Sequence, residues 1–375
     1  MTSIEPNNFP DFNPSGGKPV IKVIGAGGGG SNAVNRMFKT PLDGVEYISV
    51  NTDVQALYRA FTPIRVQIGE RLTRGLGVGG NPETGRKASE ESREGIGELV
   101  KGADLIFIAA GMGGGTGTGS APLIAELAKE SGALTVAVVT KPFDFEGSKR
   151  RNQAEEGIHK LREKVDSLIV IPNDRLSAVS NEKITMANAF ALVDDVLKQA
   201  VQAIAELVTT AGDINLDFAD VKSVMAQAGQ SWLGIGYGRG EKRAIMAAKD
   251  AIACPLLEVS IEGSKGVLFN ITGGENLTLD EVRAASDTIS QVVDPDANIF
   301  FGIVTDPTME DDVRITIIAT GFPSSEAYNE LRDQGLASLV GGPVFGNQEP
   351  DIDLPPFLRN SSMARRRLTN RTSGL

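Results

Sequence analysis

Short apolar runs recur along the first half of the chain and are separated by stretches of mixed polarity. Each run is four to seven residues long and nearly free of charge, which is typical of strands buried on both faces of a parallel sheet. The clear runs are residues 20–24, 47–50, 104–110, 134–140 and 167–172. Because helical stretches alternate with these runs, the pattern predicts a mostly parallel sheet that is covered by helices on both faces.

A much longer amphipathic stretch follows at residues 185–210. Its apolar residues recur near the helical period, at positions 186, 190, 193, 197, 201, 204 and 208, and it contains neither Gly nor Pro. We therefore expect one long helix. Beyond it, the pattern predicts helices at 241–253 and 278–293 and strands at 266–272, 297–305 and 312–320. The expected fold class is α/β, with a Rossmann-like, mostly parallel sheet domain, a long central helix and a second, smaller α/β domain.

Two glycine clusters, at residues 25–30 and 111–119, stand between a predicted strand and a predicted helix. Such a turn offers backbone N–H groups at the positive end of a helix dipole, which is what a phosphate requires. Glycines lack a Cβ atom, so the backbone can approach the anion closely. The residues expected at the phosphates are Gly28, Gly29, Ser31 and Asn32 in the first cluster and Gly113, Gly114, Gly115, Thr116, Gly117 and Thr118 in the second.

A third glycine segment spans residues 75–83 and leads into a helix that is predicted to run to about Lys101. Asn81 can cap this helix, and Pro82 suits its first turn. Two interpretations stay open. Gly79, Gly80 and Asn81 either contact a terminal phosphate or form an ordinary loop that ends in a helix cap.

Polar residues also follow two other predicted strands, at the carboxyl ends where a parallel sheet meets its ligand. Asp53 has the spacing expected of an acid that binds a ribose. Glu146 can accept hydrogen bonds from ribose hydroxyls, and Arg150 can face the sugar or the phosphates. The alternative for Glu146 and Arg150 is a solvated cluster at the start of a helix.

Phe190 and Asp194 lie four residues apart and so share one face of the long helix. Phe190 can stack on a base, and the Asp194 carboxylate can accept the N1–H and exocyclic amino hydrogens of guanine. Adenine lacks this pair of donors, so Asp194 would select guanine. A place for Phe190 in the hydrophobic core is the alternative.

The turn at residues 213–222 is rich in acids. Asp217 is suited to cap a following helix, and Asp220, three residues later, completes an acidic variant of the capping box. Asn215, Asp217 and Asp220 also give three polar side chains on one exposed turn, which can polarise a water or help to position a cation. A capping role and a catalytic role therefore both stay open.

Composition narrows the function classes. The 375 residues are 41% hydrophobic and 23% charged, as in a soluble protein long enough for two domains. A net charge of −11 argues against a general nucleic-acid binder. One cysteine and one histidine exclude an internal disulfide, a Cys/His metal site and a Ser-His-Asp triad. No apolar run is long enough to span a membrane, and residues 1–17 show no signal core, so cytoplasmic residence is expected.

The two ends of the chain are expected to lie outside the folded domains. Polar composition predicts a disordered lead at residues 1–17 and a flexible linker at 321–350. Residues 351–359 form a short apolar and acidic island, which suggests a docking peptide that orders on a partner. The basic segment 360–375 either adds attraction to an anionic surface or is a disordered tail.

Taken in order, the motifs resemble those of the tubulin/FtsZ family of GTPases over about residues 18–320 and again at 351–359. Three nucleotide loops of that family and its signature sequence resemble residues 25–32, 51–53, 75–81 and 111–119. Its ribose and guanine contacts resemble residues 143–150, Asn173-Asp174, and Phe190 with Asp194-Asp195. Its loop that enters the nucleotide site of the next subunit resembles residues 215–220.

The resemblance implies that the chain binds GTP or GDP, with Mg²⁺ held through the phosphates and water and no dedicated metal ligands. It implies a GTPase that polymerises head-to-tail into filaments of the division ring at midcell. Asn215, Asp217 and Asp220 of the neighbouring subunit would complete the active site. The implied domains are a GTP-binding domain at 18–184, a connecting helix at 185–210 and an activating domain at 211–320, whose catalytic loop is 213–220. Implied partners are further copies of the chain and, through residues 351–359, membrane tethers and division regulators, but no nucleic acid.

Two other functions stay open. Residues 25–30 match the dinucleotide fingerprint G-x-G-x-x-G, and together with Asp53 they suggest an NAD-dependent oxidoreductase, although residues 111–119 are then unexplained. The other function is that of a scaffold that binds a nucleotide without hydrolysing it. In such a scaffold, Asp217 and Asp220 would be helix caps only. The chain also departs from the family in its short linker and in the residues that follow the docking peptide.

Overall fold

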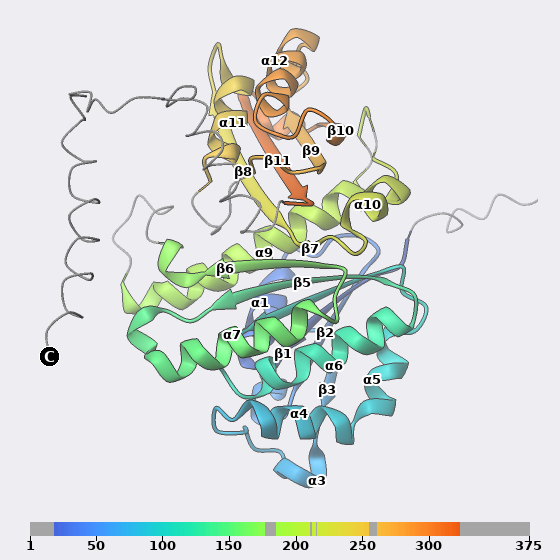
Figure 1. Ribbon diagram of the computed structural model, residues 1–375, viewed down its shortest axis with the longest axis vertical. Helices are drawn as coiled ribbons and strands as arrows, with labels where there is room; N and C mark the ends of the chain where they lie inside the picture. The colour runs from blue at the N-terminus through green and yellow to red at the C-terminus, as the bar shows by residue number, and fades with distance from the viewer. Residues whose placement is uncertain (1–18, 177–184, 211, 215, 255–260, 323–375) are drawn as a thin grey trace, which may run out of the picture. The chain divides into compact units, whose positions relative to one another are not determined.

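The computed structural model describes residues 19–176, 185–210, 212–214, 216–254 and 261–322. Within these ranges, two sheets are joined by one long helix (Figure 1). Several predictions lie outside the described residues: the lead at 1–17, Asn215, the linker beyond 322, the docking peptide at 351–359 and the tail at 360–375.

A seven-stranded sheet forms the first domain, in the strand order β3-β2-β1-β4-β5-β6-β7 (Figure 1). Every neighbouring pair is parallel, and Ile21 of β1 lies opposite Val45 on one side and Leu105 on the other. The five predicted strands are confirmed. The pattern does not predict β3, whose four residues alternate apolar and polar at the edge of the sheet. The strands are β1 (Ile21–Ala26), β2 (Val45–Asn51), β3 (Ile64–Gln67), β4 (Leu105–Gly111), β5 (Leu134–Lys141), β6 (Ser167–Pro172) and β7 (Gly229–Gln230).

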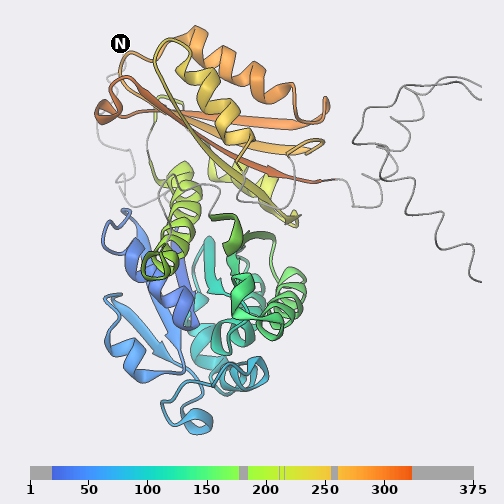
Figure 2. The same ribbon diagram turned by 90° about the vertical axis from the view of Figure 1, so that its left-hand side faces the viewer.

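Helices cover both faces of this sheet (Figures 1 and 2). One hydrophobic core lies under α5, α6 and α7, and a second lies under α1 and the long helix α9. The second core continues into the other domain, where it includes Trp232 and Phe269. The helices of the first domain are α1 (Gly27–Met37), α2 (Val54–Tyr58), α3 (Glu70–Thr73), α4 (Pro82–Glu91), α5 (Arg93–Val100), α6 (Thr116–Glu130) and α7 (Ser148–Arg162), with short turns η1 (Asp144–Glu146) and η2 (Asn173–Arg175).

The helix predicted up to Lys101 is in fact two helices, α4 and α5. Ser92 separates them, because its backbone leaves the helical conformation at φ −104° and ψ 18°. The Ser92 Oγ accepts a hydrogen bond of 3.0 Å from the backbone N–H of Gly69. A serine that bonds a neighbouring segment favours a break of this kind over a continuous helix.

The long helix α9 (Met186–Thr209) confirms the central helix of the prediction. Thr185 caps it and forms a capping box with Asn188. Near its other end, Glu206 pairs with Arg314 of the second domain at 3.0 Å. Across the described ranges, neither α9 nor any other helix is both long and apolar enough to cross a membrane.

The second domain is a four-stranded sheet in the order β10-β9-β11-β8. β9 and β10 are parallel, and β11 is antiparallel to both of its neighbours. The three strands and two helices that the pattern predicts here are confirmed, within a few residues at their ends. The elements are α10 (Phe218–Met225), β8 (Trp232–Arg239), α11 (Arg243–Ile252), β9 (Gly266–Gly273), α12 (Leu279–Ser290), β10 (Asn298–Thr305), η3 (Pro307–Met309) and β11 (Asp312–Thr320).

Strand β8 escapes the sequence pattern because every second residue in it is glycine. A Cβ atom at Gly234, Gly236 or Gly238 would overlap the backbone of α11. These glycines therefore let α11 lie directly on the strand. Their small size lowers the apparent hydrophobicity of a strand whose first residues, Trp232 and Leu233, are buried.

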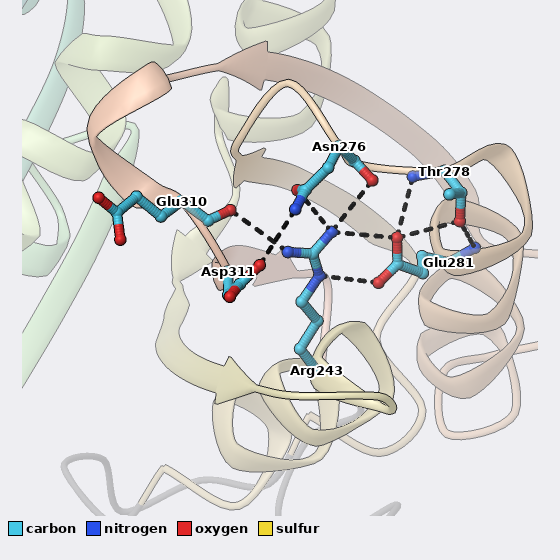
Figure 3. A network of polar contacts seen from close by, with 6 residues as sticks. All are labelled: Arg243, Asn276, Thr278, Glu281, Glu310 and Asp311. Carbon is cyan, nitrogen blue, oxygen red and sulfur yellow. Dashed lines mark hydrogen bonds and ion pairs between the residues drawn. The ribbon is translucent and has the colours of Figure 1, made fainter.

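A buried arginine joins four segments of the second domain (Figure 3). Arg243 of α11 is 5% exposed and forms two hydrogen bonds with the Glu281 carboxylate, at 2.8 and 3.3 Å. Its other N–H groups donate to the backbone oxygen of Glu310 and to both oxygens of Asn276. A buried charge that is paired and fully hydrogen-bonded in this way fixes the loops that it joins.

Candidate nucleotide-binding site

The first glycine cluster lies at the carboxyl end of β1. β1 continues to Ala26 and α1 begins at Gly27, so the predicted turn at 25–30 is largely the first turn of a helix. Gly27 has a φ of +70°, and a Cβ atom there would lie 2.5 Å from the Gly117 nitrogen. The backbones of the first two glycine clusters are therefore in direct contact.

The second cluster is likewise shorter as a loop than predicted. β4 ends at Gly111, and α6 begins at Thr116, within the glycine cluster. The Thr118 hydroxyl accepts a hydrogen bond of 2.9 Å from the Gly113 N–H. The Thr116 hydroxyl lies 2.9 Å from the Thr52 hydroxyl, at the end of β2. Both threonines thus use their side chains to fix the loops.

The third glycine segment packs against the second. A Cβ atom at Gly115 would overlap Val78, and its neighbour Asn81 caps α4 by accepting hydrogen bonds from the N–H groups of Glu83 and Thr84. The predicted cap is confirmed. All three glycine segments therefore meet at the carboxyl edge of the seven-stranded sheet, where a phosphate contact stays a prediction for each of them.

Glycines at this edge are of two kinds. Gly27, Gly115 and Gly117 touch backbone or side chains of another loop and leave no room for a Cβ atom. At several others, a Cβ atom would meet no protein atom within 4 Å: Gly28, Gly77, Gly79, Gly80 and Gly114. The first kind packs the loops together, and the second lines the open side of the edge.

Asp53 is a helix cap in the structure. One of its carboxylate oxygens accepts hydrogen bonds from the N–H groups of Gln55 and Ala56, at 2.9 and 3.2 Å. This role explains why an acid stands at the start of α2. The ribose contact expected of Asp53 stays a prediction.

Glu146 and Arg150 form an ion pair, as their spacing on adjacent turns allows. The other oxygen of Glu146 accepts a hydrogen bond of 3.0 Å from the Phe143 N–H. The Glu146 side chain is only 10% exposed and is therefore not part of a solvated cluster, whereas Arg150 is 55% exposed. The nearby Asp144 N–H donates to the Asp174 carboxylate, which brings this segment beside the end of β6.

Three phenylalanines and one asparagine mark a second part of the edge. Phe190 is 48% exposed and meets Phe143 edge-on at 5.7 Å between ring centroids, so it is not a core residue. Phe143 in turn stacks on Phe145. Asn173, at the end of β6, is 4% exposed, and its Oδ1 has no hydrogen-bond partner among the residues that the structure describes. A buried acceptor without a partner is unusual and favours a donor supplied from outside the protein.

Asp194 is paired with a residue that the sequence analysis missed. Arg36 of α1 contacts Asp194 through Nε at 3.2 Å and Asp195 through a terminal nitrogen at 3.4 Å. Burial raises the pKa of Asp194 to about 6, against the opposing effect of the Arg36 charge. The two residues are 158 positions apart, and no local pattern links them.

The acidic turn is a helix cap, as predicted. Asp217 accepts a hydrogen bond from the Ala219 N–H, and Asp220 accepts one from the Asp217 N–H, both at 3.3 Å. Within the part of the chain that the structure describes, the hydrogen bonds of both side chains stay inside this turn. The structure therefore does not bring Asp217 and Asp220 together with the glycine loops.

The acidic turn belongs to the amino edge of the seven-stranded sheet. Strand β7 follows α10 after three residues and pairs with Ser167 and Leu168, the first residues of β6. The glycine loops follow the carboxyl ends of the strands. A strand of six residues spans about 20 Å, whereas the eight residues of α10 span about 12 Å. The acids and the phosphate loops of one chain therefore stand at opposite edges.

The side chains of the described residues offer no dedicated metal centre: no three or more His, Cys, Asp or Glu gather closely enough to hold an ion. A cation at the carboxyl edge could bind through the oxygens of a ligand and through water. This is compatible with a phosphate ligand, which brings its own oxygens.

Comparison with known proteins identifies both domains. The tubulin/FtsZ family GTPase domain matches residues 20–181, and the FtsZ family C-terminal domain matches residues 229–323. An empty FtsZ dimer from M. jannaschii is 44% identical, with a TM-score of 0.77, over 81% of this chain and 88% of the other.

Two more distant structures share the fold. CetZ1 from Haloferax volcanii, a GDP-bound monomer, is 21% identical with a TM-score of 0.70, over 85% of this chain and 99% of the other. CetZ2 from the same organism, a GTPγS-bound protofilament, is 20% identical with a TM-score of 0.69, over 85% of this chain and 98% of the other. The GTPase-domain match includes residues 25–30, so the oxidoreductase hypothesis finds no support there. The identity to FtsZ across both domains shows that the chain belongs to the tubulin/FtsZ family of GTPases.

Proposed function

We propose that this chain binds GTP at the carboxyl edge of its seven-stranded sheet and hydrolyses it when it assembles head-to-tail. Asp217 and Asp220, with Asn215, complete the site of the next chain along the filament. The observation that carries this proposal is the separation of the two edges within one chain. Phosphate-binding elements stand at one edge and the acidic turn stands at the other, so they can only meet between two chains.

The residues at the carboxyl edge suit a nucleoside triphosphate. The first turns of α1 and α6 have backbone N–H groups without helical partners, and Gly28 and Gly114 are open beside them. The phosphates would therefore lie along the open glycines, with Gly79 and Gly80 closing over the terminal phosphate. Mg²⁺ bound to the phosphates would neutralise charge on the transferring group.

Base recognition would use the second part of the edge. Phe190 offers an exposed ring for stacking, and the orphaned Oδ1 of Asn173 offers an acceptor. Asp194 would accept the paired N–H donors of guanine, in competition with Arg36. Asp195 is 46% exposed and faces the same arginine, so it is the alternative carboxylate for this contact.

Hydrolysis needs a group that orients the attacking water. The first two glycine loops carry no acidic side chain, and Glu83 at the end of the third is paired with Arg86. Asp53 is a helix cap, and Glu146 is an ion-pair partner. Asp217 and Asp220 of the next chain would supply the missing group by positioning a water and its cation. Catalysis would then require assembly, and the contact would be heterologous, which generates filaments.

This activity accounts for the proposed cellular role. A GTP-dependent filament of the FtsZ type would form the division ring in the cytoplasm at midcell. Residues 351–359 would dock membrane tethers and division regulators. The self-association part is supported by the dimer and protofilament among the solved relatives.

The test is GTP hydrolysis as a function of protein concentration, with light scattering from the same cuvette. Native chain should show turnover only above a threshold concentration, and scattering should rise at the same point. Turnover that stays strictly proportional to concentration down to dilute solution would contradict the proposal, because each chain would then be a complete enzyme.

Two substitutions separate catalysis from capping. Asp220→Asn keeps an oxygen that can accept the Asp217 N–H but loses the charge, whereas Asp220→Ala loses both. The proposal expects both variants to bind GTP and scatter light, with only a small residual turnover. If Asp220 is only a cap, Asp220→Asn will hydrolyse GTP normally and Asp220→Ala will lose about 1 kcal/mol of stability. Normal turnover in both variants would mean that Asp220 is only a helix cap, whereas a native chain that binds GTP without hydrolysing it would favour the scaffold.

A further inference from the structure

Asp166 is a buried acid at the amino edge of the sheet, immediately before β6. It is 7% exposed. One carboxylate oxygen accepts a hydrogen bond of 3.0 Å from the Thr135 N–H, at the start of β5. The other accepts one of 3.4 Å from the Gln227 N–H and lies 3.4 Å from the Lys129 ammonium. This carboxylate therefore binds three segments of the chain at one point.

The segment held through Gln227 is the turn that joins α10 to β7. Gln227 has a φ of +53° and Gly229 a φ of +68°, so the turn contains two left-handed residues close together. A left-handed conformation is unfavourable for glutamine and persists only where its surroundings impose it. The Asp166 side chain supplies one such bond, and its backbone oxygen supplies another by accepting the Gly229 N–H at 2.9 Å.

The same turn sets the direction of α10. The helix ends at Met225, two residues before Gln227, and its first turn carries Asp217 and Asp220. The helix spans about 12 Å, so a change of tilt at one end moves the acids at the other. Its body rests on β5 and β9, and the Val224 carbonyl accepts a hydrogen bond of 3.0 Å from Thr320. Together with the contact on β5, Asp166 connects this helix to the seven-stranded sheet.

We propose that Asp166 is a positioning residue for GTP hydrolysis: it holds the α10–β7 turn and thereby sets where Asp217 and Asp220 are presented to the next chain. The inference rests on the proposed function, since it concerns how the donated acids are aimed. It adds that the chain which donates Asp217 and Asp220 sets their position through Asp166 of its own seven-stranded sheet. A small displacement is enough, because misplacing a catalytic group by about 1 Å can reduce the rate on the order of 100-fold.

The test compares Asp166→Ala with Asp104→Ala. Asp104 is the control, because it also stands at the amino edge and its side chain accepts a backbone N–H, that of Val20 at 2.8 Å. Among the described residues, its hydrogen bonds are with Val20 and Leu134 and not with α10. Asp166→Ala should bind GTP in dilute solution as tightly as the native chain and should assemble. Its turnover per assembled chain at saturating GTP should fall about 10- to 100-fold, whereas Asp104→Ala should keep native turnover.

A double variant distinguishes a role of Asp166 in positioning the acidic turn from a general loss of native structure. If Asp166 acts only through the acidic turn, Asp166→Ala added to Asp220→Asn will not lower the residual turnover of Asp220→Asn any further. Native turnover by Asp166→Ala, an equal loss in Asp104→Ala, a parallel loss of GTP affinity, or additive losses in the double variant would each overturn the inference.

Should Asp166→Ala fail to fold, Asp166→Asn replaces it and the same comparisons apply, because it fills the same volume and keeps one acceptor. The inference can fail alone, with Asp220→Asn inactive and both Asp166 variants fully active. The proposed function fails separately, when Asp220→Asn itself turns over GTP at the native rate.

Discussion

The carboxyl and amino edges of the seven-stranded sheet are built in opposite ways. The carboxyl edge carries glycine loops whose backbone is partly open, at Gly28 and Gly114 among others. At the amino edge, β7 pairs with the first residues of β6, and Asp166 is buried beside them. Under the proposed function, the first edge holds the phosphates and the second carries the acids Asp217 and Asp220. One chain alone would then be an incomplete enzyme.

The largest effect should come from filling a packed glycine at the carboxyl edge. Gly27→Ala puts a Cβ atom against the Gly117 backbone at a φ of +70°, which should cost about 3 kcal/mol or more in the free energy of unfolding. Gly102→Ala is the control, since Gly102 has a φ of +69° but open space around it, and should cost about 1 kcal/mol. Urea denaturation of both variants measures the difference. Equal costs would mean that the loops do not pack as described.

A second prediction concerns which acid reads the base. Asp194→Asn should weaken GTP binding about 100-fold and restore binding of xanthosine triphosphate, whose O2 accepts from the asparagine amide. Fluorescence titration of dilute chain with both nucleotides tests this. Asp195→Asn serves as the sibling control and should change GTP affinity much less. If only Asp195→Asn switches the preference, Asp195 and not Asp194 reads the base.

A smaller effect is expected from pH. The pKa of Asp194 is raised from 3.8 to about 6 by burial, so the carboxyl is partly protonated in mildly acidic solution. Protonation removes an acceptor for guanine, and GTP affinity should fall up to about tenfold between pH 7 and pH 5. The effect of pH on the stability of the nucleotide-free chain has the opposite sign. Because the pKa of Asp194 is raised in the folded chain, its carboxyl group stabilises the fold below pH 3.8, and this stabilisation is lost as the pH rises through about 6. Titration calorimetry across this range should show proton release on binding near pH 6, absent in Asp194→Asn.

The smallest effect should come from an open glycine. Gly28→Ala should change the free energy of unfolding by less than about 1 kcal/mol, because its Cβ atom meets no protein atom. It should nevertheless weaken GTP binding severalfold, because the methyl group points to the side proposed for the phosphates. Gly95→Ala in α5 is also open and should leave GTP affinity unchanged. Equal GTP affinity in all three proteins would place the phosphates elsewhere.

Local features of this molecule could be predicted from the sequence. The Asp217–Asp220 capping box, the Asn81 cap and the central helix all depend on residues within a few positions of one another. Features that depend on tertiary packing could not be predicted from the sequence. The glycines of β8 hide a strand because only the contact with α11 explains them, and the helix at residues 82–101 breaks at Ser92, beside Gly69.

The candidate site follows the same division. The glycine loops were evident because each motif is contiguous, although the helices begin earlier within them than the pattern predicts. The roles of Arg36 and Asp166 could not be predicted from the sequence. The contact of Arg36 with Asp194 and that of Asp166 with Gln227 join residues far apart in sequence. The placement of the acidic turn and the glycine loops at opposite edges likewise depends on where β7 pairs. Because β7 has only two residues, the sequence pattern cannot indicate this pairing.

The measurement that tests the central claim most directly is a mixture of two inactive chains. Asp220→Asn has intact loops and a defective acidic turn, and Gly114→Val has an intact turn and a side chain in the open glycine loop. Co-sedimentation in the same tube shows whether both enter the polymer. An active site shared between chains predicts that an equal mixture recovers about a quarter of native turnover, since half the loops then meet half the acids. Turnover that stays at the sum of the two separate chains, with both present in the pellet, would contradict the claim.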